Sequence, residues 1–211
     1  MDLVYLHGFA SGPQGSKGEF CRRWAGARGL PFQAPDLNLP AFEHLTLTAQ
    51  VETVEALLAT LAEPPVVVGS SLGGLVGAAV AHRGAPLAGL ILLAPAFGFA
   101  RRRLESGRWA GYRKRGTMPV FHFARNAWTT LGPELLADLP AWRDDDQWQI
   151  PAPLAILHGT LDEAVPLEES RAFANRHPGS VLEIVEDEHG LLAPGSLGAL
   201  ERLLEAAFAP R

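Results

Sequence analysis

The sequence predicts an α/β fold, a parallel sheet of about six strands with helices on both faces. Three observations lead to this prediction. Short apolar runs alternate with amphipathic helical patterns, most of these runs are apolar at every position, and 47% of the 211 residues are hydrophobic. Continuously apolar strands are typical of a sheet that is covered on both faces. The length fits one domain, which we expect to span residues 1–211.

Six segments have the composition of strands. Five are runs rich in Val, Ile and Leu, which favour extended backbone. These runs are residues 3–6, 66–68, 90–93, 154–157 and 181–185. Residues 32–34, which precede Pro35, form a shorter sixth candidate.

The intervening segments have the pattern of helices. Apolar residues repeat at helical spacing in residues 51–61, 72–80 and 197–208. Ser16 and Glu19 are three residues apart, which is the spacing of a capping box. We therefore expect another helix to begin at Ser16, soon after the first strand.

Residues 97–150 interrupt this alternation. No run from Phe97 to Trp148 resembles a strand, but nine of the 17 aromatic residues lie there. Residues 101–143 also hold nine of the 18 basic residues and only three acidic ones, a net charge of +6. We expect a helical cap insertion over an active site; an extra helical layer with a solvated arginine face is the alternative.

Composition excludes several classes of function. A net charge of −5 argues against a nucleic-acid-binding surface. Cys21 has no partner for a disulfide, and no signal peptide or membrane span is visible, so we expect a cytoplasmic protein without membrane partners. The sequence has no phosphate-binding glycine loop and no paired metal-ligand spacing, so we expect neither a cofactor nor a metal.

The most specific motif is Gly69-Ser70-Ser71-Leu72-Gly73, which matches G-x-S-x-G between a predicted strand and a predicted helix. This turn is so tight that side chains at the two outer positions would collide with neighbouring backbone. Ser70 competes as the nucleophile, but the glycine spacing selects Ser71. A helix N-terminus at this point favours developing negative charge.

A serine nucleophile needs a base, and the base needs a carboxylate to orient it. Asp162 follows the predicted strand 154–157, and His189 follows the strand 181–185. Both are expected at the same sheet edge as Ser71, in the chain order serine, acid, histidine. Glu163 is a rival for the acid.

The oxyanion hole is expected to use two backbone amides, the N–H of Phe9 and the N–H of Leu72. Phe9 follows the first strand in the sequence His7-Gly8-Phe9, and Leu72 follows the nucleophile. For His7 itself we expect a role in bracing the loop, with a second base as the alternative.

With nucleophile, acid and histidine in this order, the chain resembles the α/β-hydrolase superfamily. Its opening, Tyr5 to Phe9 followed by Ser11-Gly12-Pro13 and Ser16-Lys17, is similar to small bacterial esterases of the YqiA type. The resemblance implies hydrolysis of carboxylic or thioester bonds without a cofactor. The chain departs from the superfamily pattern because the usual first two antiparallel strands are missing.

These inferences predict a serine hydrolase that forms an acyl-enzyme and cleaves small carboxylic esters. The aromatic insertion suggests an apolar acyl group. Alternatives with the same triad are a thioesterase, an amidase or a C–C bond hydrolase. A non-catalytic ligand-binding protein on the same fold is the alternative of a different class, and fold alone does not decide among them.

Overall fold

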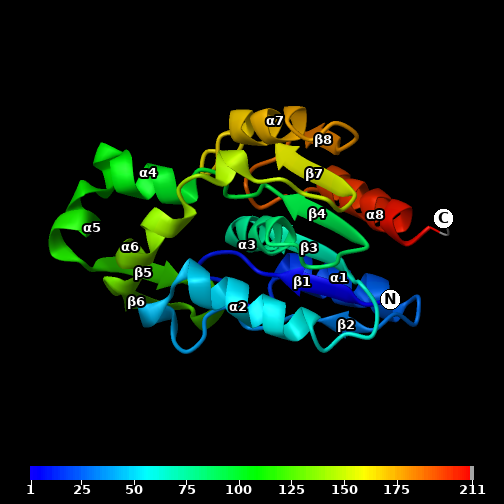
Figure 1. Cartoon of the computed structure of the whole chain (residues 1–211), viewed down its shortest axis with the longest axis horizontal. Coiled ribbons are helices and arrows are strands. Elements are labelled where there is room, and N and C mark those ends of the chain that lie inside the picture. The colour runs from blue at the N-terminus through cyan, green and yellow to red at the C-terminus, as the bar shows by residue number, and fades with distance from the viewer. Residues whose placement is uncertain (210–211) are drawn as a thin grey trace.

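The computed structural model describes residues 1–209, and its centre is a six-stranded parallel sheet. Neighbouring strands follow the order β2-β1-β3-β4-β7-β8 (Figure 1). Their bounds are Leu3–Leu6 (β1), Phe32–Gln33 (β2), Val66–Ser70 (β3), Gly89–Leu93 (β4), Leu154–Gly159 (β7) and Val181–Val185 (β8). All six predicted strands are therefore confirmed.

Alternate residues of the strands pack into two apolar cores, one on each face of the sheet. Val4 and Leu6 of β1 belong to the core under α2, α3 and α7, whereas Leu3 and Tyr5 belong to the core under α1 and α8. These helices are α1 (Ser16–Gly26), α2 (Leu47–Leu58), α3 (Leu72–His82), α7 (Leu167–Asn175) and α8 (Pro194–Phe208). Because both faces are shielded from water, β1, β3 and β4 are buried at every position.

The start of α1 differs in detail from our prediction. The helix begins at Ser16 as expected, but its N-cap is Gly15 and no side chain caps it. Ser16 already lies inside the first turn, and Glu19 pairs with Arg22 instead, at 2.8 Å. The predicted capping box is wrong, since the backbone enters the helix one residue too early for Ser16 to act as the cap.

Between β4 and β7 the chain leaves the sheet and forms an insertion. Its helices are α4 (Phe99–Glu105), α5 (Ala110–Arg115) and α6 (Glu134–Asp138). It also contains an antiparallel hairpin, β5 (Met118–His122) and β6 (Ala127–Leu131). Our expectation that this segment has no strands is wrong: the insertion is only partly helical.

The hairpin is stabilised by features that a search for apolar runs does not detect. Only one residue of each strand is fully buried, and Pro119 interrupts the first strand. Asn126 supplies the positive φ of 49° that closes the turn. Phe121 and Trp128 face each other across the strands, with ring centroids 5.7 Å apart.

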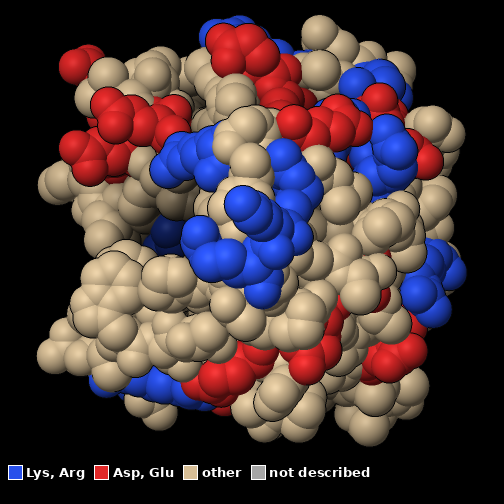
Figure 2. Space-filling view, turned by 90° about the vertical axis from the view of Figure 1, so that its left-hand side faces the viewer, with Lys and Arg blue, Asp and Glu red and all other residues tan. Residues whose placement is uncertain are grey.

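Most aromatic residues of the insertion are buried in the apolar core that it shares with the sheet. Five of the nine are buried, and they belong to the same apolar core as α2 and α3. These five are Phe97, Phe99, Tyr112, Trp142 and Trp148. The basic residues of the insertion, except the buried Arg103, lie outside, and Figure 2 shows Lys and Arg side chains gathered on the face that the insertion presents.

Candidate active site

Ser71 lies at a sharp turn between β3 and α3, with φ 53° and ψ −115°. This left-handed backbone is strained for a residue other than glycine. The turn can be this tight because Gly69 and Gly73 carry no side chain. A Cβ on Gly69 would lie 2.5 Å from the carbonyl oxygen of Gly73, and a Cβ on Gly73 would lie 2.2 Å from that of Leu6. The G-x-S-x-G spacing is thus a steric requirement.

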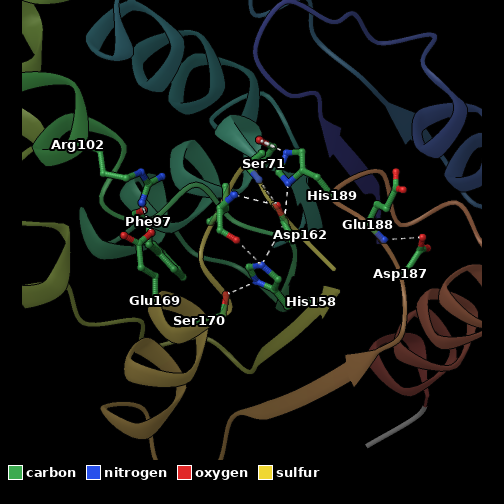
Figure 3. Close-up of polar contacts among 12 residues, drawn as sticks. Ser71, Phe97, Arg102, His158, Asp162, Glu169, Ser170, Asp187, Glu188 and His189 are labelled. Carbon is green, nitrogen blue, oxygen red and sulfur yellow. Dashed lines mark hydrogen bonds and ion pairs between the residues drawn. The ribbon is translucent and has the colours of Figure 1, made fainter. Parts of the chain in front are cut away.

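Ser71, His189 and Asp162 form a continuous hydrogen-bonded chain, as Figure 3 shows. The distance from His189 Nε2 to Ser71 Oγ is 2.9 Å, and that from His189 Nδ1 to Asp162 Oδ2 is 2.7 Å. Because Nδ1 faces a carboxylate oxygen, it carries the proton in the neutral ring. Nε2 then accepts the hydrogen bond of the serine hydroxyl.

The carboxylate of Asp162 is fully buried, and both of its oxygens accept hydrogen bonds. Its Oδ1 accepts the N–H groups of Ala164 and Val165, both at 2.8 Å. Burial by itself raises the pKa of Asp162, but the hydrogen bonds from His158, His189 and Val165 outweigh it. The pKa therefore lies well below its usual value, and the group is an anion at neutral pH.

The other acidic residues near His189 are differently placed. Glu163 is exposed. Asp187 accepts hydrogen bonds from the hydroxyl of Ser196 at 2.6 Å and from the N–H of Ala193 at 2.9 Å. In Figure 3 Asp187 lies away from the His189 ring, beside Glu188. Only Asp162, among the carboxylates of residues 1–209, is hydrogen-bonded to this imidazole.

Two backbone amides next to Ser71 have no hydrogen-bond acceptor among the described residues: those of Phe9 and Leu72. Leu72 is the first residue of α3, where an N–H has no partner within the helix. The loop that holds Phe9 is very close to the serine, since a Cβ on Gly8 would lie 3.3 Å from Ser71 Cβ. Both amides are thus available to an oxyanion near Ser71 Oγ.

His7 and Cys21 lie outside this chain of hydrogen bonds. His7 Nδ1 donates to the carbonyl of Gly8 at 3.0 Å, and Nε2 accepts the N–H of Leu37 at 2.9 Å. Burial lowers the pKa of His7, so the ring is neutral and braces the loop after β1, as expected. Cys21 is buried in the core.

Sequence reasoning missed two residues that support the site. His158 lies 3.2 Å from Asp162 and, through Nδ1, 2.7 Å from the hydroxyl of Ser170 on α7. Lys17 Nζ donates to the carbonyl of Gly190, directly after His189, at 2.6 Å. Burial lowers the pKa of Lys17 to about 8. His158 follows a strand and precedes Asp162 by four residues, which is a signal that could have identified it.

A cleft of about 960 Å³ opens beside Ser71 and His189. The loop after β1 forms one wall, and the hairpin turn His122–Arg125 forms another. The N–H of Phe123 donates to the carbonyl of Ala10 at 2.8 Å and ties these two walls together. Asp36 and Asn38 add polar surface.

The cleft is less aromatic than the sequence suggested. Among the described residues 1–209, Phe123 is the only one of the insertion's nine aromatic residues that lines the cleft. The prediction of an apolar acyl group rests on these aromatic residues, so it has less support than the sequence alone indicated. The described residues contain no group of three or more His, Cys, Asp or Glu side chains that could hold a metal. Within them, no helix is long and apolar enough to cross a membrane.

Comparison with solved structures shows the α/β-hydrolase fold. A protein from Agrobacterium vitis S4 is 21% identical, with a TM-score of 0.85 over 99% of this chain and 88% of that one. Mouse alpha/beta hydrolase domain-containing protein 10 is 20% identical, with a TM-score of 0.76 over 97% and 88%. A monoacylglycerol lipase from Paleococcus ferrophilus is 19% identical, with a TM-score of 0.73 over 96% and 91%.

The superfamily resemblance predicted from the sequence is confirmed. Curated protein sequences give no match. A family profile, in contrast, matches residues 2–193, nearly the whole chain. The protein therefore belongs to the family described as Uncharacterised protein family (UPF0227).

Proposed function

We propose that this protein is a serine hydrolase that cleaves carboxylic esters, with Ser71 as nucleophile, His189 as general base and Asp162 as the orienting carboxylate. The observation that carries the proposal is the hydrogen-bonded chain from Ser71 Oγ through His189 to the buried anion of Asp162. A likeness in fold to a monoacylglycerol lipase is consistent with ester cleavage.

The proposed reaction has two halves. Ser71 Oγ attacks the acyl carbon while its proton passes to His189 Nε2, and the amides of Phe9 and Leu72 hold the oxyanion. His189 then returns the proton to the leaving alcohol, and the C–O bond breaks to give an acyl-enzyme. In the second half, water attacks with the same base, and Ser71 regains its proton as the acid is released.

The proposal treats residues 1–211 as one domain, because the insertion shares its apolar core with α2 and α3. The acyl group is a small molecule that fits the cleft beside Ser71. A thioesterase, an amidase and a C–C bond hydrolase use the same machinery, and comparison of matched ester, thioester and amide substrates decides among them.

Labelling with a fluorophosphonate probe tests the proposal. The wild-type protein and Ser70→Ala should be labelled, whereas Ser71→Ala should not. Ser71→Ala should also reduce p-nitrophenyl butyrate turnover to a residual roughly 10³–10⁴-fold above the rate in water. Wild-type protein that is folded but neither labelled nor active on esters would indicate a ligand-binding protein instead.

A further inference from the structure

Arg103 on α4 is a buried charge without a counterion. The residue is only 8% exposed, and no carboxylate of residues 1–209 forms an ion pair with it. Of its guanidinium nitrogens, Nε is sealed from solvent without a hydrogen-bond partner. Its contacts are aromatic: Cζ lies 3.4 Å from the ring centroid of Phe99 and 4.4 Å from that of Trp109.

Aromatic rings compensate such a charge only in part. Removing an unpaired ion from water costs more free energy than a desolvated cation–π contact returns. Burial lowers the pKa of Arg103 to about 9, and the nearby Arg102 and Arg108 lower it as well. The guanidinium still carries its positive charge at neutral pH, so the fold maintains an unneutralised cation here.

Some other arginines of the insertion are neutralised by carboxylates, and all of those are more exposed than Arg103. Four of them pair with carboxylates: Arg101 with Asp146, Arg102 with Glu169, Arg125 with Glu43, and Arg143 with Glu105. Arg108, like Arg103, forms no ion pair with the described carboxylates. Its Cζ lies 5.7 Å from the same Trp109 ring.

This part of the insertion is therefore rich in cations that have no acidic partner. Arg113 adds a third, and its Nη1 donates to the backbone carbonyl of Arg103 at 2.6 Å. Figure 2 shows the basic side chains gathered on this face, beside a hollow in which a further basic side chain lies.

Neither Arg103 nor Arg108 lines the cleft, but Phe9 both lines it and contacts Arg103. The Phe9 ring lies 5.5 Å from Arg103 Cζ, and Phe9 lines the cleft beside Ser71. We propose that Arg103, assisted by Arg108, forms an anion-binding subsite next to this cleft, behind the Phe9 ring, and that the substrate carries a carboxylate or phosphate that extends to it past Phe9. A guanidinium donates two parallel hydrogen bonds to such a group. The inference rests on the proposed function for its substrate, but not for the binding of the anion.

Kinetics with matched esters test the subsite. The pair is p-nitrophenyl hydrogen adipate, which carries a free carboxylate, and its methyl ester, which is neutral. We expect the ratio of their kcat/KM values to fall roughly 10- to 100-fold in Arg103→Met, mostly through KM, since hydrogen bonds to charged groups are of this strength. Arg115→Met removes an exposed arginine of the same insertion and should leave the ratio unchanged.

Calorimetric titration with adipate and with inorganic phosphate measures binding independently of catalysis. Wild type and Arg115→Met should bind at least one anion, and the tighter of the two identifies the chemical class. Arg103→Met should lose this binding, and Arg103→Lys, which keeps the charge but not the planar fork, should weaken it.

Some outcomes would overturn the subsite. One is that wild type and Arg103→Met bind the anion equally well, and the other is that wild type binds neither adipate nor phosphate. Competitive inhibition of methyl ester cleavage by the better anion provides a check that needs no variant. If wild type cleaves neither ester but still binds the anion through Arg103, the proposed function fails while the subsite stands.

Discussion

The Nε2 of His158 lies 3.2 Å from Oδ2 of Asp162, and neither side chain has exposed surface. The same nitrogen is 3.2 Å from the carbonyl oxygen of Val165, so two acceptors require it to carry a proton. The hydroxyl of Ser170 donates to the other ring nitrogen. The acid of the candidate triad is thus held by a second histidine that α7 keeps in one tautomer.

His158→Leu is expected to lower kcat about tenfold with little change in KM. Loss of one donor to a buried carboxylate costs about 1–3 kcal/mol, and His158 does not line the cleft. His158→Gln keeps an N–H donor and should recover much of the activity. Steady-state kinetics and thermal unfolding of both variants give the measurement. Unchanged kcat in His158→Leu would mean that the His158–Asp162 contact has no catalytic effect.

Asp162→Asn is expected to lose about 10⁴-fold in kcat, the loss measured for the same replacement in another Ser-His-Asp triad. An amide cannot select the tautomer of His189 that leaves Nε2 free to accept the serine proton. Glu163→Gln is the matched control, because Glu163 is exposed and adjacent in sequence. Comparable losses in the two variants would refute the assignment of the acid.

Gly69→Ala is expected to abolish both the elbow and the activity, because its Cβ would lie 2.5 Å from the carbonyl oxygen of Gly73. Gly26→Ala, in contrast, should keep the activity and make the fold more stable. Gly26 ends α1, and its Cβ would have no heavy atom within 4 Å, so alanine should add about 0.5–1 kcal/mol of stability. The free energy of unfolding in urea should rise in Gly26→Ala and fall in Gly69→Ala, and the yield of soluble protein should rise or stay equal in the first variant and fall in the second.

The stability of the protein should depend on the ionisation of Asp145. This carboxyl is 2% exposed and accepts the N–H of Gly98, and burial raises its pKa to about 6. A raised pKa means that the folded state disfavours the anion. The contribution of Asp145 to stability is therefore complete below about pH 4, its unfolded pKa, and is lost as the pH rises through 6.

Asp145→Asn keeps an acceptor for Gly98 and removes the charge. The variant should be about 2–3 kcal/mol more stable than wild type at pH 7, and the difference should shrink toward pH 4. Denaturant unfolding at both pH values provides the test. A difference that is independent of pH would show that Asp145 is not the titrating group.

The sequence was most informative where steric and hydrophobic requirements coincide. Strands covered on both faces need apolar residues throughout, so β1, β3 and β4 were visible as uninterrupted runs. The elbow around Ser71 needs glycine at two positions, so its motif located the serine that the structure places beside His189.

Features that depend on tertiary contacts were not visible in the sequence. The strands of the hairpin β5–β6 each have only one fully buried residue, and their register depends on cross-strand pairs such as Phe121 with Trp128. The role of His158 depends on Ser170, which approaches it only when α7 packs on the sheet. The lining of the cleft depends on which aromatic residues of the insertion are buried in the core that it shares with α2 and α3.

The order in which the strands follow one another along the chain also determines when activity can arise during synthesis. Ser71 follows β3, Asp162 follows β7, and His189 follows β8, so the serine and its base are 118 positions apart in the chain. A chain that is still being synthesised can form the elbow, and it gains the base only after β8 has paired with β7. On the proposed mechanism, hydrolysis requires the finished sheet, and turnover reports that β8 has paired with β7.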